Sequence, residues 1–398
     1  MGSPGQLTWV FLLVALTSAL CRGSSAAAVC NVVDKQALLT FKSQLIDNGK
    51  FLDPWKATTN CCTWPGVTCN SAGRVTTLSL LDTFAFPNAP ADAQLKVKPG
   101  LKGAGSSLGA LKALKRLEFR NVVFSFAYPI PRELGSLPAL TDLVLIGTQC
   151  IGPIPAELGK LKSLSTLLLD GNRFPDGIPD ALGDLASLTS LQVANNQMKK
   201  IGSERITLLK NLQAFDVSTN LLSGPIPKWL GKLTLSDYIQ LGQNQFSGPI
   251  PGELCNIRGL KRIIIFETKV TAIPPQIGNC AALEELVLFD NKIAGKLPLE
   301  LAKLKKLQRI SVSRNQMSGP LPPALGDLPL LREFDIGQNK FSGPIPANYG
   351  PFDEDELSTN FSGNQLSGPI PKPLSNLRVA VFRPGNPGLC GAPLPKCK

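Results

Sequence analysis

The 398-residue chain contains no histidine, and it has only three tyrosines, three methionines and four tryptophans. Without histidine there is no Ser-His-Asp triad, no histidine-ligated zinc site and no imidazole base. The sequence also has no Gly-Lys loop of the kind that cradles phosphates. These absences argue against the common catalytic constellations, so we expect a protein that is not an enzyme and has no metal or cofactor.

Long apolar runs are also scarce, and the main one, "LTWVFLLVAL", begins at Leu7. It is short for a membrane span, and the small residues "SSAAAVC" follow it. This pattern predicts a secretory signal peptide over residues 1–28; the alternative is a retained membrane anchor. No later stretch is apolar for 18 residues, so we expect a secreted chain that does not span a membrane.

Acidic residues are fewer than basic ones, 29 against 41, which gives a formal net charge of +12. Such a surface favours polyanionic partners. Nucleic acid does not suit a secreted protein, which leaves an acidic polysaccharide or an acidic protein. The alternative is that the charge only confers solubility.

The segment "NQFSGPIP" at Asn244 has near copies that begin at Asn220, Asn339 and Asn364. Spacings of 24 and 25 residues between neighbouring copies mark a solenoid, in which each coil contacts only the coils beside it. We expect one elongated repeat domain over residues 75–376, with about 12 coils and an insertion near residues 81–98.

Each coil follows one frame, whose positions are numbered from a residue such as Leu209 or Leu233, so that Asn220 and Asn244 stand at position 12. Apolar residues at positions 7 and 9 alternate with polar neighbours, which predicts a short strand with one buried face. Asparagine recurs at position 12, where its amide can satisfy buried backbone groups; Thr148 and Thr268 can replace part of that bonding. Position 16 is glycine and positions 18 and 19 are Ile-Pro, which together form a corner of the coil.

This frame resembles the plant-type subclass of leucine-rich repeats. The ends "CNVVDKQALLTFKSQL", "DPWKATTNCCTWPGVTC" and "GNPGLCGAPLPKCK" resemble those of plant polygalacturonase-inhibiting proteins and related small secreted repeat proteins. The resemblance implies an α/β solenoid, a right-handed superhelix with a long parallel sheet on its concave face and disulfide-stapled caps over residues 29–74 and 377–398. It also implies three disulfides: Cys30–Cys61, Cys62–Cys69 and Cys390–Cys397.

The chain departs from the inhibitors in three ways. Its final cap has two cysteines where the inhibitors usually have four, its coils exceed their usual ten or so, and the insertion interrupts its first coil. Of the other cysteines, Cys150 at an inward position is expected to be a buried thiol. Cys255 and Cys280 lie about one coil apart, and either a disulfide or two free thiols fits this spacing.

A partner would contact the variable positions 6, 8, 10, 11 and 13 of the strand face. Two neighbouring coils bring large apolar side chains together there within a charged rim, which is the composition of an interface centre. Because adjacent strands lie about 4.8 Å apart, Phe266 and Phe289 should be direct neighbours. The predicted partner-binding residues are Arg262, Ile264, Phe266, Glu267, Lys269, Glu285, Val287, Phe289, Asp290 and Lys292.

A second candidate patch consists of Asp142, Val144, Ile146, Leu168, Asp170 and Arg173. For both patches the alternative is a chance scatter of exposed apolar residues. A set of basic side chains could meet an acidic chain such as pectin: Arg116, Arg120, Arg309, Arg314 and Lys340. The sequon "NFS" makes Asn360 a glycosylation acceptor, which the frame places at position 8 on the same face.

A glycosidase needs only two carboxylates, and Glu285, Asp290, Glu333 and Asp335 fall on this face. An open solenoid face gives little means to enclose a sugar, which argues against that activity. The resemblance instead implies a protein-binding module of the cell wall or apoplast that inhibits pectin-degrading polygalacturonases in defence. The alternative is a soluble receptor-like module that binds peptides or receptor ectodomains. Ice binding would need a regular face, whereas here the exposed residues change from coil to coil.

Overall fold

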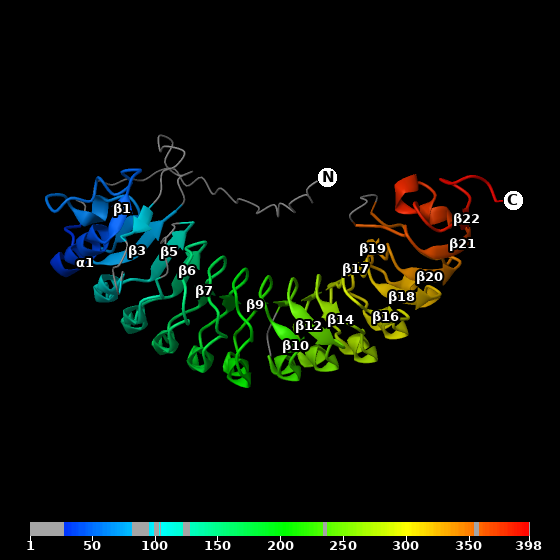
Figure 1. The fold of residues 1–398 in the computed structure, drawn as a ribbon, viewed down its shortest axis with the longest axis horizontal. Helices are drawn as coiled ribbons and strands as arrows, with labels where there is room; N and C mark the ends of the chain where they lie inside the picture. Colours follow the sequence, from blue (N-terminus) through cyan, green and yellow to red (C-terminus); the bar gives the residue numbers. More distant parts are fainter. Residues whose placement is uncertain are drawn as a thin grey trace.

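The structure is a computed structural model that describes residues 28–81, 95–98, 103, 105–121, 128–233, 237–353 and 358–397. The expected signal peptide lies outside these residues except for Ala28. The described chain winds into an arc of stacked coils, with the amino-terminal cap at one end and the carboxyl-terminal cap at the other (Figure 1). The solenoid predicted from the 24-residue period is confirmed.

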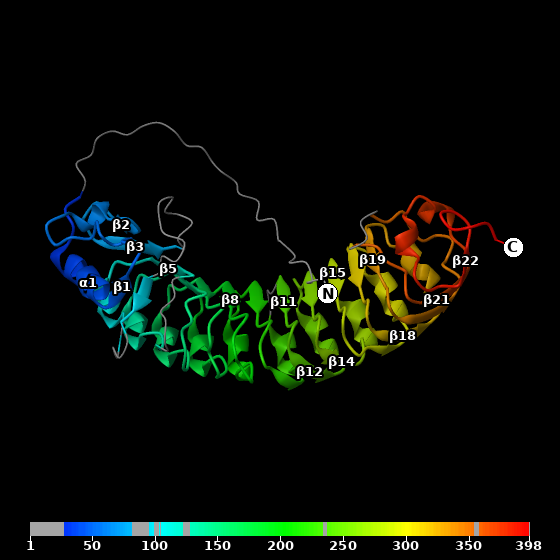
Figure 2. The same ribbon diagram turned by 45° about the horizontal axis from the view of Figure 1, so that its top comes forward.

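A twelve-stranded sheet lines the concave side of the arc (Figure 2). All its neighbouring strands are parallel except β2 (Val67–Cys69), which pairs antiparallel with β3 (Val75–Leu80). After these come β5 (Arg116–Arg120), β6 (Asp142–Ile146), β7 (Thr166–Leu168), β8 (Ser190–Gln192), β9 (Ala214–Asp216), β11 (Tyr238–Gln240), β13 (Arg262–Ile264), β15 (Glu285–Val287), β17 (Arg309–Ser311) and β19 (Glu333–Asp335). One strand per coil therefore carries the face that the frame assigns to recognition.

Short 3-10 helices form the convex side. The cap of most of them is a proline of the Ile-Pro corner, as Pro227 is for the helix that follows it. They are η3 (Ser106–Ala110), η4 (Arg132–Ser136), η5 (Ala156–Lys160), η6 (Asp180–Asp184), η7 (Glu204–Leu208), η8 (Lys228–Lys232), η9 (Gly252–Asn256), η10 (Pro275–Asn279), η11 (Leu299–Lys303) and η12 (Pro323–Asp327).

Two smaller parallel sheets, here called the lateral sheets, run beside the concave sheet along the "SGPIP" corners. One contains β10 (Ser223–Pro225), β12 (Gln245–Gly248) and β14 (Lys269–Val270). The other contains β16 (Ala294–Gly295), β18 (Gln316–Gly319), β20 (Lys340–Gly343), β21 (Gln365–Pro369) and β22 (Gly388–Cys390). The repeated eight-residue segment is therefore a lateral strand followed by the entry to a convex helix.

The predicted asparagine ladder forms inside the coils. The side-chain amide of Asn220 donates to the carbonyls of Val193 at 3.0 Å and Val217 at 3.1 Å, and its oxygen accepts from the Met198 N–H at 2.9 Å. Where threonine stands at position 12, the Thr148 hydroxyl donates to Asn172 Oδ1 at 2.7 Å. Each asparagine thus joins its own coil to the preceding one.

Position 11, just before the ladder, adopts a left-handed backbone in coil after coil. Asn195, Gln243, Glu267 and Asp290 have φ between 49° and 57° although none is glycine. Such a backbone is sterically unfavourable for these residue types, and the surrounding ladder holds it in place. The chain turns there from the concave sheet towards the lateral sheets.

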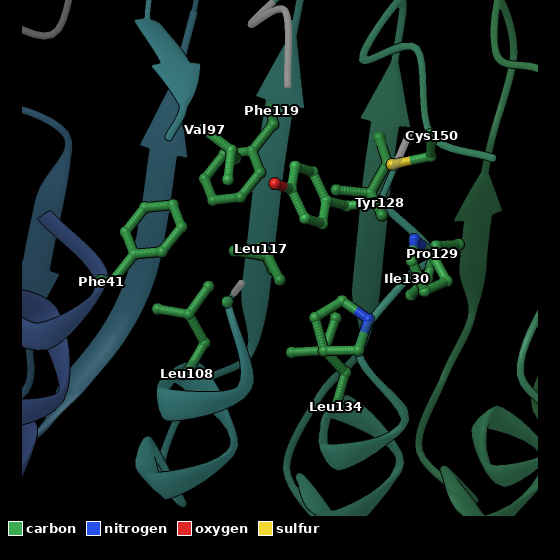
Figure 3. Close-up of a pocket in the computed structure, with 13 residues that line it drawn as sticks. Phe41, Val97, Leu108, Leu117, Phe119, Tyr128, Pro129, Ile130, Leu134 and Cys150 are labelled. Carbon is green, nitrogen blue, oxygen red and sulfur yellow. The ribbon is translucent and has the colours of Figure 1, made fainter. Parts of the chain in front are cut away.

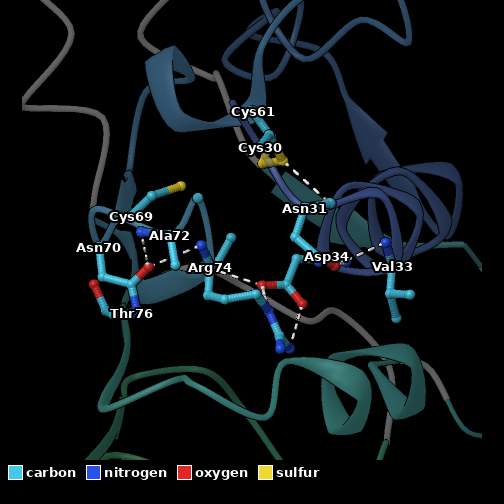
Figure 4. Close-up of polar contacts among 12 residues, drawn as sticks. Cys30, Asn31, Val33, Asp34, Cys61, Cys69, Asn70, Ala72, Arg74 and Thr76 are labelled. Carbon is cyan, nitrogen blue, oxygen red and sulfur yellow. Dashed lines mark hydrogen bonds and ion pairs between the residues drawn. A yellow bond between two sulfur atoms is a disulfide. The ribbon is translucent and has the colours of Figure 1, made fainter. Parts of the chain in front are cut away.

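The amino-terminal cap covers the first coil with α1 (Val32–Ser43) and η1 (Cys61–Thr63). Asp34 of α1 is fully buried; its carboxylate accepts from Arg74 Nε at 2.9 Å and from the Val75 N–H at 2.9 Å (Figure 4). This contact fastens the helix to the start of β3. Burial of the apolar side of α1 against the first coil hides a face that would otherwise be exposed to water.

The disulfides Cys30–Cys61 and Cys62–Cys69 close the amino-terminal cap, and Cys390–Cys397 closes the other cap beside η13 (Lys372–Leu374) and η14 (Val379–Val381). These are the pairs that the family resemblance implies. The structure also joins Cys255 to Cys280, which the sequence left open. Of the insertion near residues 81–98, the described part is β4 (Leu95–Val97), which pairs antiparallel with β1 (Leu45–Asp47) of the cap.

Candidate functional site

The candidate site is the concave face, formed by the side chains at positions 6, 8 and 10 of each coil. Strand register aligns equivalent positions of neighbouring coils, as Tyr238, Arg262 and Glu285 are aligned at position 6. The face is therefore an array in which each side chain has neighbours along its own strand and from the strands on both sides.

Phe266 and Phe289, here called the aromatic pair, stack across two neighbouring coils at position 10. Their ring centroids lie 4.8 Å apart, and the ring planes differ by 14°. Both side chains are half-buried rather than interior. The spacing of the strands predicts this contact, and the structure confirms it.

Two apolar residues of the predicted patches are buried instead of exposed. Val144 is 1% exposed and Val287 is 6% exposed. Both stand at position 8, in the middle row of the face, where Val144 lies in register between Glu118 and Leu168. Both valines are therefore buried in the middle row, and the prediction that they are accessible is wrong.

Three charged residues of the predicted patches, Arg173, Lys269 and Lys292, also lie away from the concave sheet. Position 13 is where the lateral strands begin, as Lys269 begins β14. Arg173 forms a bridge with Ile151 at that level, and Lys292 lies two residues before β16. All three face solvent beside the lateral sheets, so their assignment to the concave patches is wrong.

The remaining patch residues are placed as the frame indicates. Arg262, Ile264 and Glu285 lie on β13 and β15, while Asp142 and Ile146 lie on β6. All five are half-buried. Leu168 and Asp170 follow at the end of β7, and Glu267 and Asp290 occupy the left-handed turns that border the face.

The arginines proposed for an acidic polymer are mostly paired with carboxylates. Glu118 accepts from Arg116 and Arg120, with nitrogen–oxygen distances of 2.9 and 2.6 Å. Arg309 lies 3.1 Å from Glu333, and Arg314, on the border of the face, lies 3.4 Å from Asp290. Lys340 begins the lateral strand β20. These contacts leave little free positive charge on the concave sheet.

Polar residues cluster in the middle of the face, and of these the sequence analysis predicted only Asp170. We call Asp170, Gln192, Asp216 and Tyr238 the central polar cluster. Gln192 donates to the Tyr238 hydroxyl at 3.0 Å, and the Arg262 guanidinium lies 5.0 Å from the centroid of the Tyr238 ring. Tyr238 at position 6, Gln192 and Asp216 at position 8 and Asp170 at position 10 all stand at positions that the frame assigns to the face, but the prediction favoured apolar side chains.

Burial alters the acidity of this cluster. The pKa of Asp170 is raised to about 6, mainly by burial and also by the nearby Asp216 carboxylate, while the Ala194 N–H and Arg120 lower it. Burial also raises the pKa of Asp216, against hydrogen bonds from Ser218. The pKa of Tyr238 rises to about 12, again mainly through burial. These carboxylates are therefore held in a setting that disfavours their charge.

Asn360, the glycosylation acceptor, forms an isolated bridge with Asp335 at position 8, in agreement with the frame. Its side-chain oxygen accepts from the Ser362 N–H at 2.9 Å, and its amide nitrogen lies against Gly337. A glycan there would occupy the far end of the concave face.

An apolar cavity of about 40 Å³ lies apart from this face, between the amino-terminal cap and the first coils (Figure 3). Phe41, Phe119, Tyr128 and Leu134 line it together with Cys150. Burial raises the pKa of the Cys150 thiol to about 11, so the thiol is protonated at neutral pH. The cavity is too small for anything larger than a few water molecules.

Two family models match the chain. A Leucine rich repeat N-terminal domain matches residues 33–70, and a Leucine Rich Repeat matches residues 211–233 and 306–328. The matched segments are the amino-terminal cap and two coils of the solenoid. The chain has the leucine-rich repeat fold.

The relatives of this leucine-rich repeat protein include receptors. The leucine-rich repeat receptor-like serine/threonine-protein kinase RGI4 of Arabidopsis thaliana is 34% identical over 127 residues, which is 31% of this chain and 10% of that kinase. Among solved structures, the plant peptide hormone receptor RGFR1 in complex with RGF2 is 28% identical with a TM-score of 0.54, covering 69% of this chain and 51% of that one. The chain therefore corresponds to only part of these receptors.

A plant ice-binding protein is also similar, at 25% identity and a TM-score of 0.60; the match covers 93% of this chain and 98% of that one. Leucine-rich repeat solenoids typically act as protein-interaction scaffolds. Among the described residues, no helix has both the length and the apolar character of a membrane span.

Proposed function

We propose that the chain is an extracellular recognition module that binds a polypeptide partner across its concave sheet. The observation that carries this proposal is the aromatic pair, half-buried on an open sheet face. Stacked aromatic rings inside a charged rim have the character of an interface hot spot. Four disulfides, three of them in the caps, suit an oxidising compartment outside the cell.

Peptides and receptor ectodomains are the partner class that we favour. The similarity to a peptide hormone receptor in complex with its peptide supports this class. An open face of parallel strands offers an extended segment a long row of side-chain contacts, with a strand spacing of about 4.8 Å. Such a partner needs no enclosed pocket.

Inhibition of polygalacturonases in the cell wall is the second candidate. The cysteine-containing caps that resemble those of polygalacturonase-inhibiting proteins favour it. Under this proposal the aromatic pair contacts the enzyme and the solenoid blocks access to pectin. Pectin itself is a less suitable ligand of the concave sheet, because Arg116, Arg120 and Arg309 are already paired with carboxylates.

The experiment compares the wild-type protein with the double variant Phe266→Ala/Phe289→Ala. A matched control is Leu299→Ala/Leu330→Ala. These two leucines lie away from the concave sheet and are 67% and 40% exposed. Each immobilised protein is incubated with a plant microsomal extract, and bound receptors are identified by mass spectrometry. We expect the wild type and the control to retain the same receptor ectodomain and the aromatic variant to lose it.

A parallel assay follows the release of reducing ends from polygalacturonate by fungal and insect polygalacturonases. If the wild type inhibits these enzymes and the aromatic variant does not, the result would favour the second candidate, inhibition of polygalacturonases. Partners retained equally by all three proteins would contradict binding through the concave sheet. Ice-growth assays should show no activity, because the concave side chains differ in size and charge from coil to coil.

A further inference from the structure

The charge of the concave face is opposite to that of the whole chain. At positions 6, 8 and 10 of the described coils there are four arginines and seven carboxylates, although the chain carries a net charge of +12. The arginines are Arg116, Arg120, Arg262 and Arg309; the carboxylates are Glu118, Asp142, Asp170, Asp216, Glu285, Glu333 and Asp335. An acidic face on a basic protein selects for cationic partners.

Two of the carboxylates that give the face its excess negative charge, Asp170 and Asp216, lie in the central polar cluster. Three of the four arginines form ion pairs with neighbouring carboxylates, and Arg262 lies over the Tyr238 ring. Within the described residues, neither Asp170 nor Asp216 lies within ion-pair distance of a lysine or arginine. Asp170 accepts from the Ala194 N–H at 2.7 Å, and Asp216 accepts from the Ser218 N–H at 2.8 Å and from the Ser218 side chain.

Asp216 lies in register with Gln192 and Gln240 at position 8, but the neighbouring row at position 10 is made of short residues. Ala194, Ser218 and Gly242 occupy position 10 in the three coils between Asp170 and the aromatic pair. A long side chain of a partner can therefore reach the carboxylates without displacing a large side chain of the solenoid. The aromatic pair ends this run of short residues on one side, because Phe266 lies directly over Gly242.

We propose that the concave face binds an extended peptide segment with a lysine or arginine side chain over Asp170 and Asp216 and an apolar side chain against the aromatic pair. This inference rests on the proposed function and names its partner more closely. Asp216 and Asp170 lie two and four strands from β13, or roughly 10 to 19 Å at about 4.8 Å per strand. At about 3.3 Å per extended residue, three to six residues separate the two side chains.

The energetic reason is the desolvation of the carboxylates. A half-buried carboxylate without a cation has lost part of its hydration without a compensating charge, and a bound ammonium or guanidinium restores that compensation. The direction of the pKa shift at both aspartates agrees with this arrangement, since burial raises each of them. Asn variants keep an oxygen that accepts from Ala194 and Ser218, so they remove the charge and retain the local hydrogen bonds.

The test selects binding peptides from a phage-displayed library of random dodecapeptides, with the full chain immobilised. Four proteins are compared: the wild type, Asp170→Asn/Asp216→Asn, Phe266→Ala/Phe289→Ala, and a control, Asp53→Asn/Asp176→Asn. The control removes two exposed carboxylates away from the concave sheet and changes the net charge equally. We expect wild type and control to enrich peptides with Lys or Arg three to six residues from an apolar residue.

The two concave variants should fail in different ways. The Asp170→Asn/Asp216→Asn protein should still enrich apolar residues and lose the preference for Lys and Arg, whereas the aromatic variant should lose binding altogether. A selected peptide is then synthesised with norleucine in place of its lysine. We expect at least about a ten-fold loss of affinity for the wild type and no change for the aspartate variant.

Equal affinity of the lysine and norleucine peptides for the wild type would overturn this inference. If the aromatic variant still lost binding, the proposed function would stand without it. The inference would also be overturned if the aspartate variant enriched peptides with Lys or Arg as strongly as the wild type does. If no peptide were enriched by the wild type, both the inference and peptide recognition would be contradicted.

Discussion

The Phe266 ring lies directly over Gly242 of the preceding coil. A methyl group added at Gly242 would come within 2.7 Å of Phe266 Cδ1 and 2.8 Å of Cε1. Phe266 is therefore held between a bare stretch of backbone and the Phe289 ring, 4.8 Å away between centroids. The absence of a side chain at Gly242 is what allows the aromatic pair to stack.

Gly242→Ala should disturb the aromatic pair without breaking the fold, because Gly242 does not have a left-handed backbone. Phe266 must move away from the added methyl group. We expect binding of a peptide selected by the wild type to weaken about ten-fold, measured by fluorescence anisotropy. The matched control is Gly337→Ala at the same position of a later coil, where the methyl group would meet Asn360 instead. Equal affinity of both variants would contradict the assigned role of Gly242.

Asn220→Ala should destabilise the solenoid by about 2–4 kcal/mol, because it removes three donor contacts and leaves the buried Met198 N–H without an acceptor. Urea unfolding followed by circular dichroism measures the change. The control Asn256→Ala, at an exposed convex position, should stay within about 0.5 kcal/mol of the wild type. A ladder variant as stable as this control would show that the asparagines do not hold the coils together.

Arg74→Ala should cost about 3 kcal/mol, since it leaves the fully buried Asp34 carboxylate without its cation. The Arg74 side chain is 31% exposed, which places the effect at the lower end of the range for buried pairs. Arg132→Ala removes an ion pair with Glu133 whose side chains are 76% and 43% exposed, and should cost less than about 1 kcal/mol. Thermal unfolding compares the two, and similar losses would refute the importance of the cap contact.

Asp170→Asn should make thermal stability less dependent on pH. Burial raises the pKa of Asp170 to about 6 in the folded chain, above the value of about 3.9 for an unfolded one. The folded state therefore binds more protons than the unfolded state between these values, and wild-type stability falls as pH rises from about 4 to 6. Over this interval we expect the melting temperature of the variant to fall less than that of the wild type, with a difference of about 2 °C or more. The exposed control Asp176→Asn should follow the wild type; parallel curves for all three proteins would contradict the shift.

The sequence predicts what depends on the repeat itself. The period determines one strand per coil, the position-12 asparagines determine the ladder, and strand spacing brings Phe266 and Phe289 into contact. All three follow from contacts between a coil and the next one. The same regularity places Asn360 opposite Asp335.

What the sequence did not predict depends on the sizes and directions of neighbouring side chains. Val144 and Val287 are at exposed positions of the frame, yet both are buried. The sequence analysis assigned Arg173, Lys269 and Lys292 to the concave face because the frame did not show that position 13 already belongs to the lateral strands. The bond between Cys255 and Cys280 needs their side chains to converge across two convex helices, which spacing alone leaves open.

Site-specific photocrosslinking tests the central claim, that a partner lies on the concave sheet at the aromatic pair. p-Benzoylphenylalanine replaces Phe289 in one protein and Ser318 of the lateral strand β18 in another, and each is irradiated with a peptide selected by the wild type. The account predicts a crosslinked peptide from position 289 and none from position 318. Crosslinks that form from position 318 and not from position 289 would contradict it.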